Sequence, residues 1–344
     1  MSKYLSHEEI HNQYISLQQT LDYMLENSAM LRNFFSGSGD LVMIGCGSSY
    51  WMSLSAHKTL KLKTGCRAYA VKAGDVVLCP EEYTSLYDNP VFLCPSRSGL
   101  TRELLDAVDI FKEAYPNCKV FSIVEYVDNK LTAKSDMSLN IFWANEKSVC
   151  QTRSFSNLYL AFIVLAAIIG EDNVFIENLK KYLKAAPQLC KQHEAVVREL
   201  ADPAKITDLV ALGGGLQYGV VIEGAYIVIE MAEFASNYYQ LLEYRHGPIV
   251  TGGPGTAVFI CTGMPEEHES KMAEETKATG AKVYAVASKP VDWADHVFLL
   301  DDEYNKEIVA LHFVFVMQSF AYYFSIARGK NPDSPGNLIP FIVY

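Results

Sequence analysis

The chain has 344 residues, half of them hydrophobic, a length and composition that favour two domains of ordinary size with a large core. Its formal net charge of −11 argues against nucleic acids and anionic membranes as partners. The eight cysteines form no C-x-x-C pair, which favours reduced thiols in the cytoplasm over a disulfide framework or a zinc site. We therefore expect a cytoplasmic protein that needs no metal and no cofactor.

A helical pattern over 7–35 opens the chain and has none of the features of a signal peptide. The first expected strand, 41–44, is followed by a loop that contains Gly47, Ser48 and Ser49, and a helical pattern continues over 51–62. Free N–H groups and the dipole at a helix N-terminus favour an anion, glycine allows close approach, and hydroxyls add donors. This pattern predicts an anion-binding loop.

The next expected strand, 91–94, leads into a loop of the same kind. Ser96, Ser98 and Thr101 supply its hydroxyls, and a helical pattern follows over 102–114. Either loop alone could be an ordinary turn or helix cap, because these residue types fill such positions widely. Two of them in succession favour a phosphate site, and neither has the Gly-Lys-Ser/Thr of a Walker loop or a complete G-x-G-x-x-G. The pair indicates a small phosphorylated ligand bound without a metal.

The two halves of the chain repeat one pattern at an offset of about 165 residues. The runs 41–47, 91–94 and 119–124 match the runs 209–215, 258–261 and 282–287. Each half alternates short apolar strands with longer helical patterns, which is typical of a parallel sheet covered by helices on both faces. We expect an α/β protein with two tandem doubly wound parallel-sheet domains, 1–190 and 191–344.

Between these halves, the longest uninterrupted apolar run, 158–170, is too short to span a bilayer and predicts a buried helix. A polar helical pattern follows over 171–199. The chain ends in a segment from residue 331 with three prolines and a glycine, which predicts an irregular tail. No membrane association is expected.

The second half lacks the serine loops, since it has glycines at 213–215 and the segment 262–265 in their places. It carries instead an apolar helical pattern over 220–233, in which Glu223 and Glu230 share one face. Burial is costly for a carboxylate unless it is paired, and burial raises its pKa. Each glutamate is therefore either a satisfied structural acid or a proton-transfer group.

One histidine has a distinctive setting, because His246 stands directly before Gly247 and Pro248 on an expected constrained loop. The ordinary pKa of histidine suits acid–base catalysis near neutral pH. A lone histidine is more often a surface loop residue, and the other histidines of the chain have no comparable setting.

Taken together, these motifs resemble the sugar isomerase (SIS) family, and more narrowly the isomerase half of glucosamine-6-phosphate synthase and the fructosamine-6-phosphate deglycases. The resemblance covers nearly the whole chain and rests on 46–49, 96–101, 149–153, 223–224, Glu230, 243–248 and 335–338. It implies flavodoxin-like SIS domains in both halves. The glutaminase domain of the synthase and its cysteine nucleophile find no match here, so ammonia from glutamine is not expected to form within this chain.

The resemblance also implies a role for each matched residue. A sugar phosphate would be bound by Gly47, Ser48, Ser49, Ser96, Ser98 and Thr101, with Arg97 in place of a synthase glutamine and adding positive charge. Val149, Thr152 and Glu223 would lie at the sugar. Glu230 would carry a proton, and His246, supplied by the partner subunit, would open the sugar ring. The resemblance thus implies a homodimer with shared active sites.

One difference from the synthase bears on the reaction. The synthase forms a Schiff base through a tail lysine, and that position here is Pro340; a second synthase lysine matches Ile227. A deglycase needs no such lysine, because its substrate already carries nitrogen at C1. The resemblance therefore favours proton transfer by Glu230 between C1 and C2 of a ketosamine 6-phosphate, with release of an amine and a hexose 6-phosphate.

Two alternatives stay open. One is aldose–ketose isomerisation or deamination of an amino-sugar 6-phosphate. The other is a sugar-phosphate sensor without turnover, as occurs where SIS domains are joined to DNA-binding modules. The sequence has no helix-turn-helix pattern or basic patch and has both Glu230 and His246, which favours an enzyme.

Overall fold

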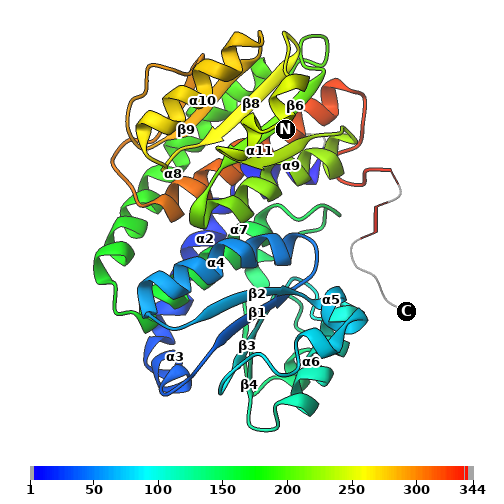
Figure 1. The fold of residues 1–344 in the computed structure, drawn as a ribbon, viewed down its shortest axis with the longest axis vertical. Helices are drawn as coiled ribbons and strands as arrows, with labels where there is room; N and C mark the ends of the chain where they lie inside the picture. The colour runs from blue at the N-terminus through cyan, green and yellow to red at the C-terminus, as the bar shows by residue number, and fades with distance from the viewer. Residues whose placement is uncertain (1–3, 337, 340–344) are drawn as a thin grey trace. The chain divides into compact units, whose positions relative to one another are not determined.

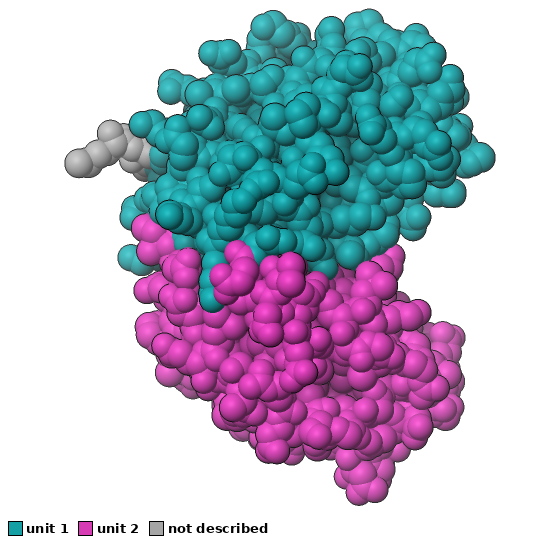
Figure 2. Space-filling view, turned by 90° about the vertical axis from the view of Figure 1, so that its left-hand side faces the viewer, with its two compact units in different colours: residues 1–14, 147–152, 178–338 teal, residues 15–146, 153–177, 339–344 magenta. Residues whose placement is uncertain are grey.

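The computed structural model describes residues 4–336, 338 and 339 of the chain (Figure 1). These residues form two compact units, which are coloured separately in Figure 2. Unit 2 contains 15–146, 153–177 and 339, and unit 1 contains 4–14, 147–152, 178–336 and 338. Each unit holds one of the two sheets.

The units interleave along the chain and do not divide at the expected boundary between residues 190 and 191. The predicted N-terminal helical segment is three helices, α1 (Leu5–His11), α2 (Gln13–Glu26) and α3 (Ser28–Phe35), and α1 belongs to unit 1. The backbone N–H groups of Leu5 and Ser6 donate to the Asp333 carboxylate at 2.9 and 2.8 Å. This carboxylate satisfies donors that the first turn of α1 leaves unpaired, and it ties α1 to the segment of unit 1 that contains Asp333.

Unit 2 is built on five parallel strands in the order β2-β1-β3-β4-β5 (Figure 1). The strands are β1 (Leu41–Gly45), β2 (Ala68–Lys72), β3 (Val91–Ser96), β4 (Lys119–Val124) and β5 (Met137–Asn140). The helices of this unit include α4 (Ser48–Thr64), α5 (Ala73–Leu78), α6 (Arg102–Ala114) and α7 (Arg153–Ile169). Parallel strands require such crossover connections, and this strand order is the flavodoxin-like one. The fold class predicted for this half is confirmed.

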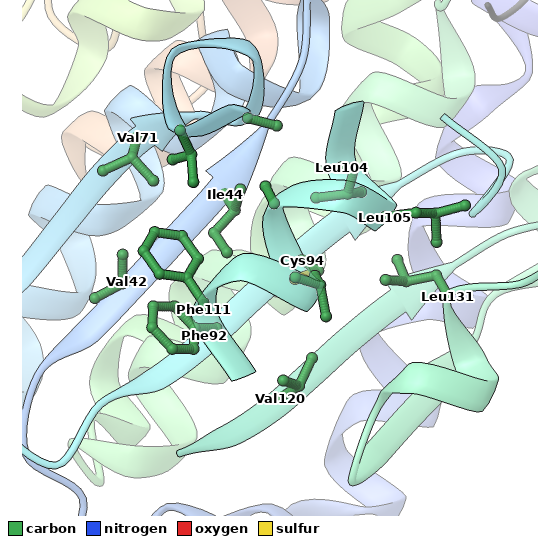
Figure 3. Close-up of a cluster of buried hydrophobic side chains, with 14 of the residues drawn as sticks. Val42, Ile44, Val71, Phe92, Cys94, Leu104, Leu105, Phe111, Val120 and Leu131 are labelled. Atoms are coloured by element: carbon green, nitrogen blue, oxygen red, sulfur yellow. The ribbon is translucent and has the colours of Figure 1, made fainter. Parts of the chain in front are cut away.

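The apolar runs of the sequence form the core of unit 2. On one face of the sheet, Val42, Ile44 and Phe92 pack beneath α6, whose Phe111 stacks on Phe92 with ring centroids 4.2 Å apart (Figure 3). The predicted buried helix is α7, in which every residue from Ser154 to Ile168 is buried. Removal of this apolar surface from water is the main force that holds the layers together.

Unit 1 repeats the same topology, with five parallel strands in the order β10-β9-β8-β6-β7. The strands are β6 (Asp208–Gly213), β7 (Asn237–Gln240), β8 (Thr256–Cys261), β9 (Lys282–Ala287) and β10 (His296–Leu299). The helices include α8 (Asn173–Leu200), which begins in unit 2, and α9 (Tyr218–Ala232), α10 (Glu266–Ala278) and α11 (Lys306–Ala327). Strands β6, β8 and β9 occupy the places of β1, β3 and β4, so the predicted repeat is confirmed.

Helix α11 is long and apolar enough, by length and composition, to cross a membrane, but 94% of its most apolar 18-residue window is buried inside the protein. It packs closely on α9, because a Cβ at Gly224 would lie 2.6 Å from Cε1 of Phe313. Burial of this degree is that of a core helix, and α11 is longer than the apolar run singled out in the sequence.

Candidate functional site

The two serine loops lie next to each other in unit 2, at the carboxyl ends of β1 and β3. These strands pair in parallel, and β1 has β2 on its other side. The chain therefore moves outward in one direction after β1 and in the other after β3, and ligands of such sheets bind at this switch point. The predicted phosphate loops thus occupy the position where this fold binds its ligands.

Two glycines shape the loop after β1. A Cβ at Gly45 would lie 2.7 Å from the backbone of Ser49, and Gly47 has a φ of +51°, which favours glycine. Ser48 and Ser49 then begin α4 and are almost completely buried. The loop therefore brings backbone and hydroxyl donors to the N-terminus of a 17-residue helix.

The thiol in this loop is not set up as a nucleophile. Burial and the nearby Glu103 carboxylate raise the pKa of Cys46 to about 12, so the thiol stays neutral at neutral pH. Glu103 lies in the first turn of α6, and its influence on Cys46 shows how near the two serine loops are to each other.

In the loop after β3, the serine hydroxyls accept hydrogen bonds from the loop's own backbone. Ser96 Oγ accepts from the N–H of Gly99 at 2.9 Å, and Ser98 Oγ accepts from the N–H of Leu100 at 3.1 Å. Gly99 has a φ of +61°, which favours glycine. A hydroxyl that accepts in this way keeps its own proton as a donor. Together with Thr101, the N-cap of α6, the loop offers an anion several donors.

Arg97, in the middle of this loop, is directed to a buried carboxylate. Its Nη1 lies 3.6 Å from Oε1 of Glu146, both side chains are almost completely buried, and Glu146 also accepts from Ser154 Oγ. The carbonyl oxygen of Arg97 accepts from the N–H of Glu125 at 3.1 Å. Glu146 therefore opposes the positive charge of Arg97 that was expected to act on a phosphate. Through these contacts Arg97 stabilises the conformation of the loop.

Glu125, which directly follows β4, was not predicted from the sequence as a site residue. Its side chain is 1% exposed, and neither carboxylate oxygen has a hydrogen-bond partner among the residues that the structure describes. Burial and the neighbouring Glu146 raise the pKa of Glu125 well above its usual range. The one available signal was its position, an acid at the end of a strand that lies beside the serine loops.

The equivalent loop ends in unit 1 are filled by the protein's own side chains. Oε1 of Glu269 accepts from the N–H groups of Gly263 and Met264, both at 2.7 Å, after β8. The sulfur of Met264 would lie 2.9 Å from a Cβ at Gly214, which follows β6. Because a carboxylate already takes the amides that an anion would use, this geometry supports the placement of the phosphate site in unit 2 alone.

The two acids of α9 differ in burial. Glu223 is completely buried, whereas Glu230, in the last turn, is partly exposed. Burial, followed by the charges of Glu230 and Glu223, raises the pKa of Tyr226, so both carboxylates lie close to this phenol. The two carboxylates thus lie beside one phenol, and of the two only Glu230 is open to solvent.

His246 is exposed on a short, well-defined loop after β7. Gly247 has a φ of +138°, which favours glycine, and Nε of Arg245 donates to Glu275 of α10 at 3.1 Å. The loop is thus constrained, as the Gly-Pro pair predicted, and it presents the imidazole to the outside of unit 1.

Two of the three residues expected to lie at the sugar, Val149 and Thr152, belong to segment 147–152 of unit 1. The N–H of Val149 donates to the carbonyl of Asp333 at 3.0 Å, and the carbonyl of buried Thr152 accepts from Nε2 of Gln318 at 2.8 Å. Hydrogen bonds of their backbone groups thus hold both residues in place. Pro340, where the synthase has its tail lysine, lies outside the described residues.

A cavity of about 360 Å³ lies elsewhere in unit 1, lined by residues that include Ile206, Thr256 and Lys282. Ile206 precedes β6, and Thr256 and Lys282 are the first residues of β8 and β9. The candidate residues of this unit follow the carboxyl ends of strands, so the cavity is not part of the candidate site.

No known family model matches the chain. Solved structures share its fold: the tagatose-6-phosphate ketose/aldose isomerase of Escherichia coli has a TM-score of 0.87 at 21% identity, over 98% of this chain and 96% of that one. The C-terminal domain of the glucosamine-fructose-6-phosphate aminotransferase of Francisella tularensis has a TM-score of 0.80 at 20% identity, over 97% and 99%. The chain therefore has the tandem SIS fold of phosphosugar isomerases.

Two comparisons extend to the sequence. The glutamine–fructose-6-phosphate aminotransferase [isomerizing] of Sulfolobus acidocaldarius is 27% identical over 96% of this chain and 55% of that protein. The glucosamine-6-phosphate deaminase of Thermotoga maritima is 28% identical with a TM-score of 0.76, over 94% of this chain and 99% of that one. The chain spans about half the length of the curated relatives that it matches, and the resemblance predicted from its motifs is confirmed.

Proposed function

We propose that this protein is an enzyme that transfers a proton between C1 and C2 of an aminated hexose 6-phosphate and thereby releases the amine. The observation that carries the proposal is the pair of serine loops at the switch point of unit 2, whose counterparts in unit 1 are filled by Glu269 and Met264. This pair favours a phosphate, and the likeness in fold to phosphosugar isomerases favours a sugar phosphate.

The phosphate would be held by hydroxyls and by two helix N-termini. Ser48 and Ser49 begin α4, while Ser96, Ser98 and Thr101 surround the start of α6. These donors are neutral, so they would bind a dianion through hydrogen bonds and helix N-termini, without a metal. We expect tight discrimination between a 6-phosphosugar and the free sugar.

Glu230 is the proposed proton carrier. From a ketosamine it removes a proton from C1 and returns a proton to C2, while the nitrogen loses a proton and O2 gains one, so that the C1 amine becomes an imine and C2 carries a hydroxyl. Water then adds to C1, the C–N bond breaks, and the amine leaves with glucose 6-phosphate as the other product. His246 is the proposed ring-opening group, supplied by a partner subunit, and its exposed position supports this role.

The favoured substrate is a ketosamine (fructosamine-type) 6-phosphate. Pro340 and Ile227 stand where the synthase has lysines, and a substrate that already carries nitrogen at C1 needs neither of them. The second candidate is glucosamine 6-phosphate, supported by the 28% identity to the Thermotoga deaminase. The same proton transfer, run from C2 to C1, would release ammonia and fructose 6-phosphate. We expect either reaction to occur in the cytoplasm.

A substrate screen tests the proposal. The purified chain is incubated with 6-phosphorylated fructosamines, with glucosamine 6-phosphate and with their unphosphorylated counterparts, and released amine and hexose 6-phosphate are measured. We expect turnover of a phosphorylated substrate and none of its free sugar. Binding of these compounds without any turnover would instead identify a sugar-phosphate sensor and would contradict the proposal.

A further inference from the structure

Unit 1 contains a cluster of metal-ligating side chains that the proposed function does not use. His7 and His11 come from α1, Glu194 comes from α8, and their ligand atoms all lie within 4.8 Å of one another. Nε2 of His7 lies 3.1 Å, and Nε2 of His11 3.7 Å, from Oε1 of Glu194. The cluster is partly buried, with His11 the least exposed and the other two still open to solvent.

The sequence around the two histidines has a known metal-binding spacing. Residues 7–11 read His-Glu-Glu-Ile-His, which fits the pattern H-E-x-x-H. On a helix, residues four apart lie on one face, so both imidazoles can approach one ion. A carboxylate as the third ligand completes the His₂Glu set that zinc takes in several enzymes.

The distances within the cluster suit a tetrahedral ion. Zinc bonds of roughly 2.0–2.1 Å with tetrahedral angles place the ligand atoms about 3.3 Å apart. The separations of 3.1 and 3.7 Å to Glu194 lie on either side of this value. The two imidazoles stack with ring centroids 4.3 Å apart, so the rings must rotate for both nitrogens to bind one ion. The oxygen of Tyr323 lies 3.4 Å from Nε2 of His7, and water would take the fourth position on the ion.

Neighbouring groups orient the ligands. Nδ1 of His11 lies 2.8 Å from the carbonyl oxygen of His7 and donates to it, since a carbonyl only accepts. This bond assigns the lone pair of the neutral ring to Nε2, which lies 3.7 Å from Oε1 of Glu194 and 3.2 Å from Oγ of Ser319. Tyr323 donates its hydroxyl to Oε1 of Glu194. Outer hydrogen bonds of this kind are typical of metal-ligating histidines and carboxylates.

We propose that His7, His11 and Glu194 bind one divalent transition-metal ion, with Zn²⁺ as the preferred ion. The ion fastens α1 to α8 within unit 1. No step of the proposed sugar chemistry passes through it.

The test uses the full chain, freed of metal with a chelator and then titrated with Co²⁺ as a spectroscopic substitute for Zn²⁺. Co²⁺ distinguishes nitrogen and oxygen ligands from the eight cysteine thiols of the chain, because thiolates add an intense charge-transfer absorption. We expect one ion per chain, with tetrahedral ligand-field bands and no thiolate absorption. Zn²⁺ should displace Co²⁺ and raise the melting temperature, because it binds only the folded chain.

Glu194→Gln and His7→Ala should each weaken binding at least tenfold and abolish the thermal shift. The matched control is His57→Ala: Nδ1 of His57 bonds the carbonyl of Ser53 one turn back, as in His11, but no second histidine joins it in a metal-ligating group within the described residues. Circular dichroism checks that each variant is folded, and His7, whose side chain is 30% exposed, can be removed without leaving a buried cavity. Failure of the wild-type chain to bind either ion, or equal binding by all variants, would overturn the proposal.

Discussion

Glu230 is the residue on which the proposed chemistry depends most. Glu230→Gln keeps the shape of the side chain and removes the base, so we expect kcat to fall by about 10²–10⁴ with little change in KM. Steady-state kinetics on the substrate found in the screen measures both constants. Glu223→Gln, on the same helix but completely buried, is the comparison and should lower kcat far less. Near wild-type turnover by Glu230→Gln would make Glu230 a structural residue.

Glu125 should make the stability of the protein depend on pH. Burial and Glu146 raise its pKa, while Arg97 and Arg153 oppose this effect. Because the folded state keeps a proton that the unfolded state loses above about pH 4.5, this group's stabilisation is complete below that pH and is lost as the pH rises.

We therefore expect Glu125→Gln to gain stability relative to the wild-type chain between pH 5 and pH 8, as measured by urea unfolding at each pH. Glu113→Gln, at an exposed site on α6, should not change how the free energy of unfolding varies with pH. If the free energy of unfolding of Glu125→Gln varied with pH as that of the wild-type chain does, Glu125 would be ionised in the folded state.

For individual residues, the sequence alone predicted a role where that role depends on neighbours in the chain. The serines, Gly47 and Gly99 act within their own loops, and their neighbours in the chain define their setting. Glu125 and the pairing of Arg97 with Glu146 were not predictable, because the partners come from distant segments that only the sheet brings together. The spacing of His7 and His11 was visible, but the third member of their cluster, Glu194, lies far along the chain.

Among the elements, the loop between β3 and α6 is the most testable part of the phosphate site. Ser96→Ala combined with Thr101→Ala removes two hydroxyl donors and should weaken binding of a 6-phosphosugar at least tenfold, about 1.4 kcal/mol, with the fold intact. Calorimetry on the wild-type and variant chains measures the change. Thr262→Ala, in the equivalent loop after β8, is the matched control and should leave binding unchanged. Unchanged binding in the double variant would remove the site from this loop.

The strands and their connecting helices were largely predictable, because short apolar runs such as those of β1 and β3 contrast sharply with the longer helical patterns between them. The helices of the N-terminal region were harder to predict. The sequence predicts one helical segment, whereas the structure has three helices, and α1 joins unit 1 through Asp333, a contact between the two ends of the chain. The apolar length of α11 also escaped notice because polar residues such as His312 and Gln318 interrupt the run, although both are buried.

For the molecule as a whole, the proposed sharing of active sites predicts complementation between subunits. Glu230→Gln and His246→Ala should each be nearly inactive as homodimers. After the two are unfolded and refolded together, half of the dimers are mixed and each has one intact site, so activity should recover to roughly a quarter of the wild-type value. No recovery despite demonstrated subunit exchange would place both residues in one chain's site or remove His246 from the chemistry.

The identity of the released sugar distinguishes proton transfer between C1 and C2 from direct displacement of the amine. A ketosamine 6-phosphate, 1-amino-1-deoxyfructose 6-phosphate, is incubated with the wild-type chain in deuterated water, and the products are identified by NMR. Proton transfer between C1 and C2 predicts ammonia and glucose 6-phosphate that carries deuterium at C2, because the carboxyl proton of Glu230 exchanges with solvent. Displacement of the amine without proton transfer would instead give fructose 6-phosphate, and that product, or no product from any aminated hexose 6-phosphate, would contradict the account.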